Sequence, residues 1–229
     1  MIVIGLTGGI ATGKSTVAAL FRRLKVPALS ADRIVQQLYR PKSPLLKKIR
    51  QQIGPKSINP QGRLNRTVVA AAVFSHPHLK ARLEAIVHPF VMHTLDQELA
   101  KLRRKKCKIA VVEIPLLFEA RTERRFDKII VVRAPQGIQI KRVMQRYAQS
   151  AADARRRIKA QWPLTKKIAR ADSIIDGFGP LSKTRRQVAS VVREVGRVVR
   201  HDPVRRGRRH SGGAGAQRNL PRSRRSRAR

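Results

Sequence analysis

A glycine-rich segment near the start of the chain is the feature that most constrains the fold. Residues 8–15 read GGIATGKS and match the pattern G-x-x-x-x-G-K-[ST] at every required position. The apolar run Ile2–Thr7 before the segment predicts a buried strand, and Ser15–Leu24 after it has apolar residues at helical spacing. Strand, glycine loop and helix in this order favour a phosphate-binding loop over the alternative, a glycine-rich turn that binds nothing.

The residue types of this loop are those that bind the phosphates of a nucleoside triphosphate. Glycines let the backbone curl so that its amide groups face a phosphate, and the start of the helix adds the positive end of its dipole. A lysine at position 14 is expected to reach the β- and γ-phosphates, and the Ser15 hydroxyl is expected to bind Mg²⁺. ATP and Mg²⁺ are therefore the expected cofactors. The residues expected to bind them from this loop are Gly8, Gly9, Ala11, Thr12, Gly13, Lys14, Ser15 and Thr16.

Further short apolar runs predict the rest of a sheet. These runs are Val26–Ser30, Lys108–Ile114, Lys128–Val132 and, more weakly, Ser173–Asp176. They are continuous and rich in β-branched residues, as in strands that are buried on both faces, and helical patterns lie between most of them. The sequence therefore predicts an α/β fold, with a parallel sheet of five strands and helices on both faces.

The long interval between the second and third predicted strands points to a helical insertion. Ala31–Cys107 is about 77 residues, far more than a loop that joins such strands usually has. Helical apolar spacing occurs within it at Pro44–Ile53, Asn65–Phe74 and Leu79–Lys101. Pro89 lacks an amide hydrogen, so we expect the last of these helices to kink or restart there. The insertion is expected to span about residues 41–107 of a folded domain that covers residues 1–200.

The end of the sequence divides into a helix and a basic tail. Leu181–Val199 carries a stripe of valines at helical spacing, which predicts a last helix packed on the sheet. From position 201 onward Arg, Gly, Ser and Pro dominate, and such a composition buries too little apolar surface to offset the entropy of ordering the chain. Residues 201–229 are expected to be disordered.

Charge is the most unusual property of the composition. Lys and Arg number 52 against 13 Asp and Glu, a net charge of +39, of which the tail carries about +9 and residues 1–200 about +30. This excess fits either phosphate-rich small molecules or a nucleic-acid backbone. Aromatic residues are only 4% and no nucleic-acid-binding motif is recognised, which disfavours base stacking as the main function. Nonspecific nucleic-acid contact through the basic tail is expected as a side property.

The compartment is expected to be the cytoplasm. Cys107 is the only cysteine and has no partner for an internal disulfide, and the first residues lack the features of a signal peptide. No apolar run approaches the roughly 20 residues that a membrane-spanning helix needs, so no membrane association is expected.

One carboxylate stands out as a candidate catalytic base. Asp32 is the only acidic residue among the first 83 and follows the second predicted strand, at the sheet edge where ligands bind in open α/β folds. A kinase needs a carboxylate there to orient the acceptor hydroxyl and accept its proton. The alternative is that Asp32 only caps the following helix.

Three further charged residues are candidates for the same site. Glu113 ends the third predicted strand, where phosphate-loop proteins often place an acid that contacts Mg²⁺ directly or through water; the alternative is an acid that simply ends a strand. Arg142 and Arg146 are four residues apart, hence on one face of a predicted helix, and could clamp phosphates during catalysis. Their alternative is a solvated basic face.

These residues and several longer segments together resemble the dephospho-coenzyme A kinase family over about residues 1–195. The His-Pro pair followed by PLLFE is more specific than the phosphate loop, which many kinases share. The matching segments are GLTGGIATGKST at 5–16, SAD at 30–32, GRLNR at 62–66, LEAIVHP at 83–89, EIPLLFE at 113–119, FDKIIVV at 126–132, QIKRVMQR at 139–146 and ADSIID at 171–176.

The resemblance implies transfer of the ATP γ-phosphate to the 3′-hydroxyl of dephospho-coenzyme A, the last step of coenzyme A biosynthesis. It places Asp32 as the base and the acceptor largely in the insertion. It also implies a lid over about residues 147–165 that closes on ATP, with Arg157 reaching in. An alternative for His88 is a histidine that breaks a helix before proline. The implied acceptor contacts are Arg66, His88, Pro115, Leu116, Leu117 and Glu119.

Three positions depart from the family pattern. Ser30, Ala11 and Gly177 stand where the family usually has aspartate, glycine and asparagine. Ser30 leaves the expected base intact but removes a neighbouring charge, and Gly177 puts adenine contacts near that loop in doubt. Two other functions stay open at this point. One is a phosphate-loop kinase for a nucleoside monophosphate or another small metabolite, and the other is a basic nucleic-acid-binding protein with a vestigial loop.

Overall fold

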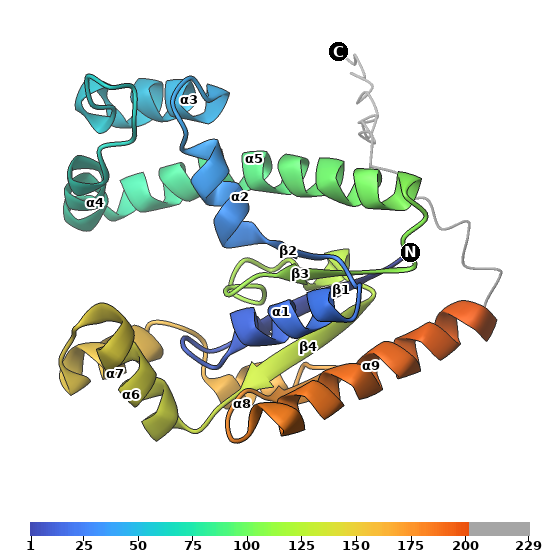
Figure 1. Cartoon of the computed structure of the whole chain (residues 1–229). Coiled ribbons are helices and arrows are strands. Elements are labelled where there is room, and N and C mark those ends of the chain that lie inside the picture. The colour runs from blue at the N-terminus through green and yellow to red at the C-terminus, as the bar shows by residue number, and fades with distance from the viewer. Residues whose placement is uncertain (202–229) are drawn as a thin grey trace, which may run out of the picture.

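The structure, a computed structural model, describes residues 1–201 and is built around one parallel sheet (Figure 1). The sheet has five strands in the order β2-β3-β1-β4-β5, and every neighbouring pair is parallel. The predicted α/β class with a five-stranded parallel sheet is therefore confirmed. The strands are β1 (Ile2–Gly8), β2 (Ala28–Ser30), β3 (Ile109–Glu113), β4 (Lys128–Arg133) and β5 (Ser173–Asp176).

Helices cover both faces of the sheet because its strands are apolar on both sides. Alternate residues of β1 enter different cores: Ile4 packs with α1 and α9, whereas Val3 packs with α2 and α5. The valines of α9 that were predicted to face the sheet do so at Val188, Val191 and Val195. The α-helices are α1 (Lys14–Arg23), α2 (Ala31–Leu38), α3 (Pro44–Ile53), α4 (Arg66–Ser75), α5 (Pro77–Arg104), α6 (Gln136–Tyr147), α7 (Ala151–Lys159), α8 (Leu164–Ile168) and α9 (Leu181–His201), with short 3₁₀ turns at Pro55–Ser57 and Glu123–Arg125.

The long interval between β2 and β3 holds α2 to α5, and α3 and α4 stand apart from the sheet in Figure 1. Leu45, Leu46 and Ile49 of α3 form a small core of their own against the first half of α5. The second half of α5 enters the sheet core through residues such as Leu95. One long helix thus connects the outlying helices to the sheet.

Of the two outcomes expected at Pro89, a kink or a restart, the restart is wrong, because α5 runs through this residue without interruption. The reason is packing on both sides of the proline: Val87 and Phe90 contact the α3 core, while Val91 and Leu95 are buried against the sheet. These contacts hold both halves in one helix despite the missing amide, whose cost is about 3 kcal/mol in a helix interior. The alternative interpretation of His88 as a residue that breaks a helix is wrong for the same reason.

The remaining expectations concern the two ends of the chain. The basic tail predicted to be disordered, 201–229, lies outside the described residues except for its first position, which ends α9. Within residues 1–201, no helix is both long and apolar enough to cross a membrane.

Candidate active site

The loop between β1 and α1 is tightly packed. A Cβ atom added at Gly8 would lie 2.2 Å from the Val132 carbonyl oxygen, so no side chain fits there. Gly13 occupies the N-cap of α1 with φ +98°, a left-handed conformation that glycine adopts without strain. Ala11 also has a positive φ, of 57°, which costs about 1–2 kcal/mol for a residue with a side chain. Thr12 is buried and its hydroxyl donates to the Gly9 carbonyl at 2.9 Å, closing the loop.

Lys14 begins α1 and turns its side chain back into the loop. Its ammonium group donates to the carbonyl oxygens of Gly9 at 2.7 Å and Gly8 at 3.4 Å. Burial lowers the pKa of Lys14 from 10.5 to about 8, although the nearby carboxylates of Glu113 and Asp32 act in the opposite direction. The ammonium group is therefore held against the phosphate loop, and it keeps its proton at neutral pH.

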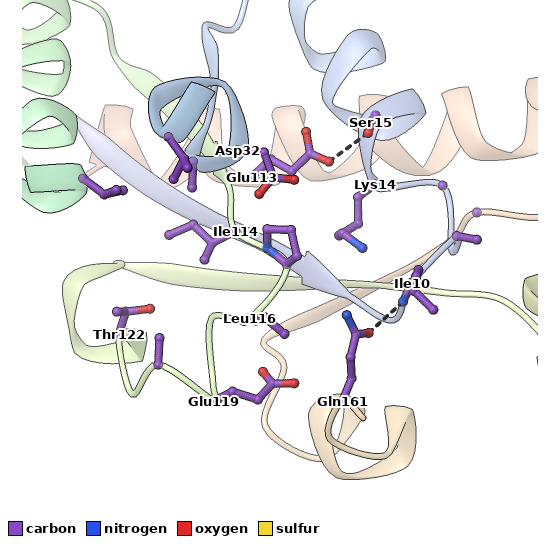
Figure 2. Close-up of a pocket in the computed structure, with 18 of the residues that line it drawn as sticks. Ile10, Lys14, Ser15, Asp32, Glu113, Ile114, Leu116, Glu119, Thr122 and Gln161 are labelled. Carbon is purple, nitrogen blue, oxygen red and sulfur yellow. Dashed lines mark hydrogen bonds between the residues drawn. The ribbon is translucent and has the colours of Figure 1, made fainter. Parts of the chain in front are cut away.

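The Ser15 hydroxyl donates to Oε1 of Glu113 at 2.9 Å, across 98 residues of sequence. Glu113 is buried at the end of β3, and Figure 2 shows it beside Asp32 and close to Lys14. This contact rules out the interpretation of Glu113 as an acid that merely ends a strand. Hydroxyl and carboxylate oxygens are ligands that Mg²⁺ prefers, so the pair fits the expected ion. Within residues 1–201, no group of three or more His, Cys, Asp or Glu side chains forms a complete metal site.

Asp32 lies in the first turn of α2 and is exposed to the cavity. The alternative that it caps this helix is wrong, because Ser30 holds the N-cap position and Asp32 comes two residues later. Ser30 is one of the departures from the family pattern, and its side chain makes no capping hydrogen bond. The carboxylate of Asp32 is close enough to Lys14 to raise the pKa of that lysine.

These groups line a cavity of about 1190 Å³ between the sheet edge, α2, α5 and α6. Gly8, Gly9 and Thr12 are buried and do not line the cavity. The predicted site residues that do line the cavity are Ala11, Gly13, Lys14, Ser15, Thr16, Asp32, His88, Glu113, Pro115, Leu116, Glu119, Arg142 and Arg146.

Two expected acceptor contacts and one expected lid contact lie outside this lining. Leu117 is fully buried in the core, because it packs on the sheet directly over Gly5. Arg66 is exposed at the start of α4 and reaches only the neighbourhood of Tyr39, a cavity residue whose pKa it lowers against the stronger raising effect of burial. Arg157 lies with its guanidinium 4.8 Å from the ring centre of Tyr147, another cavity residue.

Arg142 connects the phosphate loop to the segment after β5. Its guanidinium donates to the carbonyl oxygens of Ala11 at 3.1 Å and Gly177 at 2.9 Å. A Cβ atom at Gly177 would lie 1.9 Å from the Thr12 carbonyl oxygen, so the loop here packs against bare backbone. Arg146 is exposed one turn later on the same side of α6 and lines the cavity. The two arginines thus share a face toward the site, and Arg142 in particular is not part of a solvated basic face.

Two residues in and just before α8, which the sequence does not single out, also contact the site. Oε1 of Gln161 accepts a hydrogen bond from the Ile10 amide of the phosphate loop at 2.8 Å (Figure 2). Lys167 is fully buried and its ammonium group lies 2.8 Å from Oε1 of Glu119. Neither residue belongs to a local motif that signals such a contact. The sequence around Lys167 gives no signal either, because the helix LTKKI has two adjacent lysines and only one of them is buried.

A parallel sheet with a phosphate loop at the end of its first strand, a lysine and serine in that loop, and a free carboxylate across the cavity define the class of phosphate-loop kinases. Comparison with known proteins identifies the family within this class. The family model described as "Dephospho-CoA kinase" matches residues 2–182. The chain belongs to the dephospho-CoA kinase family.

Individual relatives agree with the family match. A protein named dephospho-CoA kinase from Geobacillus kaustophilus is 39% identical over 193 residues, which cover 84% of this chain and 96% of the relative. One from Anaeromyxobacter dehalogenans is 41% identical over 179 residues, covering 78% and 85% of the two chains. A crystal structure of a Thermus thermophilus protein has a TM-score of 0.74 and 35% identity over 84% of this chain and 97% of that one. The structure of dephospho-CoA kinase from Campylobacter jejuni has a TM-score of 0.64 and 27% identity, with 86% and 98% covered.

Proposed function

We propose that this chain transfers the γ-phosphate of ATP to the 3′-hydroxyl of dephospho-coenzyme A and releases coenzyme A and ADP. The observation that carries the proposal is the position of Asp32. This carboxylate faces the phosphate loop across a cavity that the helices of the insertion also line. The family to which the chain belongs supplies the identity of the acceptor.

In this mechanism the loop amides and Lys14 bind the phosphates of ATP. The Lys14 ammonium leaves the carbonyl oxygens of Gly8 and Gly9 and follows the negative charge that develops on the transferred group. Arg146 adds a second cation from α6. Arg142 contributes by fixing the loop through its contact with Ala11, and its remaining donors are available to a phosphate.

The acceptor side of the reaction depends on Asp32. Its carboxylate orients the 3′-hydroxyl toward the γ-phosphorus and accepts the hydroxyl proton as the new O–P bond forms and the bond to the ADP oxygen breaks. Ser15, supported by Glu113, would hold Mg²⁺ directly or through water. When bound, the ion neutralises charge on the β- and γ-phosphates.

The same proposal assigns functions to the two outer parts of the domain. The insertion, about residues 41–107, holds much of the acceptor and contributes His88 as a contact. Pro115, Leu116 and Glu119 are contacts from the segment after β3. Residues of about 147–165 form the lid that covers ATP and excludes water, which would otherwise accept the phosphoryl group. The lid is already linked to the phosphate loop by the bond between Gln161 and Ile10.

Acceptor profiling tests the proposal. With ATP and Mg²⁺, dephospho-coenzyme A should stimulate ADP release at least about 10²-fold more efficiently than nucleoside monophosphates or other small alcohols, because only the correct acceptor satisfies the buried polar groups of the site. Phosphorus NMR of the product should show the new phosphate on the ribose 3′-oxygen. Turnover with nucleoside monophosphates and none with dephospho-coenzyme A would refute the assignment.

The pKa of Lys14 predicts the pH dependence of ATP use. Because burial lowers this pKa to about 8, the free enzyme loses the ammonium charge as the pH rises through 8, and kcat/KM for ATP should then fall about tenfold per pH unit. The measurement is kcat/KM for ATP on both sides of pH 8, with saturating dephospho-coenzyme A. The value at saturating ATP, kcat, should fall at a higher pH, since bound phosphates favour the charged lysine. A profile of kcat/KM that stays flat well above pH 8 would contradict the prediction.

A further inference from the structure

The segment 161–167, here named the lid stem, comprises the end of the connection after α7 and most of α8, and it contacts two walls of the cavity. At its start, Gln161 accepts from the Ile10 amide at 2.8 Å. Next along the chain, the Trp162 amide donates to Oε1 of Glu119 at 3.0 Å. At its end, the Lys167 ammonium donates to the Pro115 carbonyl oxygen at 3.2 Å and lies 2.8 Å from Oε1 of Glu119.

Lys167 is an unusual residue to find at this place. Its side chain is 0% exposed, while Glu119 retains 18% of its exposure on the cavity side. Removing an ammonium group from water is costly, and an ion pair in the interior returns little net stability. Apolar residues of similar volume would serve the core at least as well. The positive charge of Lys167 is therefore better explained by its contacts with neighbouring groups, which it holds in position, than by a contribution to the stability of the fold.

Lys167 holds the segment from Pro115 to Glu119, which follows β3 and forms one wall of the cavity. The Pro115 carbonyl oxygen receives a second hydrogen bond, from the Thr7 hydroxyl of β1 at 3.2 Å, so it is fixed from the sheet and from the lid stem together. Pro115 lies two residues after Glu113, which contacts Ser15. Both Pro115 and Glu119 line the cavity.

The two carboxylate oxygens of Glu119 have different surroundings. Its Oε1 accepts from Trp162 and pairs with Lys167, while its Oε2 is buried and has no hydrogen-bond partner among residues 1–201. A buried carboxylate oxygen without a partner loses its hydration, and no hydrogen bond offsets that cost. This cost indicates that Lys167 and Trp162 hold Glu119 for its position in the cavity wall and not for stability.

We propose that Lys167 is a positioning residue for the phosphoryl acceptor: it holds Pro115 and Glu119 in the cavity wall that the bound acceptor contacts. The inference rests on the proposed function, because it treats the wall from Pro115 to Glu119 as part of the acceptor site. The lid stem thereby links closure over ATP to the shape of the acceptor pocket.

Replacing Lys167 with methionine tests the inference, since methionine has a similar length and no charge. The KM for dephospho-coenzyme A should rise about tenfold or more, because a small displacement of positioning groups has large kinetic effects, while the KM for ATP should stay within about threefold. Lys166→Met is the matched control. Lys166 is exposed on the same helix, with its ammonium 4.0 Å from the Trp162 ring centre, and its loss should leave both constants near wild type.

A double variant separates positioning from folding. Lys167→Met alone leaves the Glu119 charge without its partner and is expected to lower Tm, whereas Lys167→Met with Glu119→Gln removes both charges and should recover most of that loss. If the residues only stabilise the fold, the double variant should also recover the acceptor KM. Glu119→Gln alone is the reference, because it alters the direct contact and keeps Lys167. Positioning predicts that the acceptor KM of the double variant stays above that of Glu119→Gln. This outcome decides the question even if Lys167→Met alone does not fold.

A binding measurement keeps this inference distinct from the proposed function. Trp162 is the only tryptophan of the chain, and its ring stacks on Phe118 at 6.1 Å, next to Glu119. Its fluorescence should change as dephospho-coenzyme A is added in the presence of ADP, with a midpoint about tenfold higher in the double variant. A wild type that neither binds nor phosphorylates dephospho-coenzyme A refutes the proposed function. A functional wild type with unaltered Lys167 variants refutes only the positioning role.

Discussion

Replacing Lys14 with alanine is expected to lower the turnover of ATP and dephospho-coenzyme A by about 10³-fold, which corresponds to roughly 4 kcal/mol of transition-state stabilisation. The lysine supplies a full positive charge inside a loop whose other donors are backbone amides, and no other lysine among residues 1–201 lines the cavity. Arg142 and Arg146 approach from α6 and cannot take the same place. Initial rates at saturating concentrations of both substrates measure the effect.

The fold should survive this change. The left-handed backbone at Gly13 and the hydrogen bond within the loop from Thr12 to Gly9 do not involve the Lys14 side chain. Moreover, burial of the ammonium group opposes folding, as its lowered pKa indicates. The Tm at neutral pH should therefore be close to wild type. Lys141→Ala, an exposed lysine of α6, is the control and should retain full turnover.

The sheet could be predicted because its signals are local. Continuous runs such as Ile129–Val132 are apolar at every position, as in a strand that is buried on both faces. The phosphate loop could be predicted for a similar reason: a Cβ atom added at Gly8 or Gly13 would meet backbone atoms, so the motif reflects a geometric requirement. Asp32 could be found because acids are so rare in the first part of this chain.

Contacts between distant segments could not be predicted in this way. Whether Leu117 faces the cavity or the core depends on how the turn after β3 lies over Gly5, and no spacing rule gives that orientation. Lys167 meets Pro115 across 52 residues, and nothing in the sequence of α8 names its partner. The helix does not restart at Pro89, because α5 packs on two separate cores, and local propensity does not include that packing.

The structure shows the surroundings of two positions that depart from the family pattern, Ala11 and Gly177. Ala11 accepts a left-handed backbone that glycine would adopt at lower cost, and its carbonyl oxygen is held by Arg142. Gly177 lets the backbone after β5 approach Thr12 and presents its own carbonyl oxygen to the same guanidinium. Both positions therefore contribute to one arginine-centred contact behind the phosphate loop.

Asp32→Asn should lower turnover by about 10²–10⁴-fold, because asparagine keeps the size of the side chain but cannot accept the proton of the acceptor hydroxyl. The affinity for ATP should change little, since the loop amides, Lys14 and Ser15 remain. Single-turnover rates together with ADP titrations separate the chemical step from nucleotide binding. Asp96→Asn, which removes a surface carboxylate paired with Arg125, is the matched control and should leave the rate within about twofold of wild type.

Stability provides the second half of this test. Because Ser30 holds the N-cap of α2 and Asp32 lies inside the first turn, the substitution removes only a favourable interaction with the helix dipole, worth about 0.3–1 kcal/mol. Asp32 also faces Lys14, so the variant should lower the pKa of that lysine further and move the fall in kcat/KM for ATP to a lower pH. A normal turnover combined with a large drop in Tm would show that Asp32 serves the helix and that another group is the base. A lost turnover with an unchanged Tm and a shifted pH profile would place the carboxylate between the acceptor and the phosphate loop, where the proposed mechanism needs it.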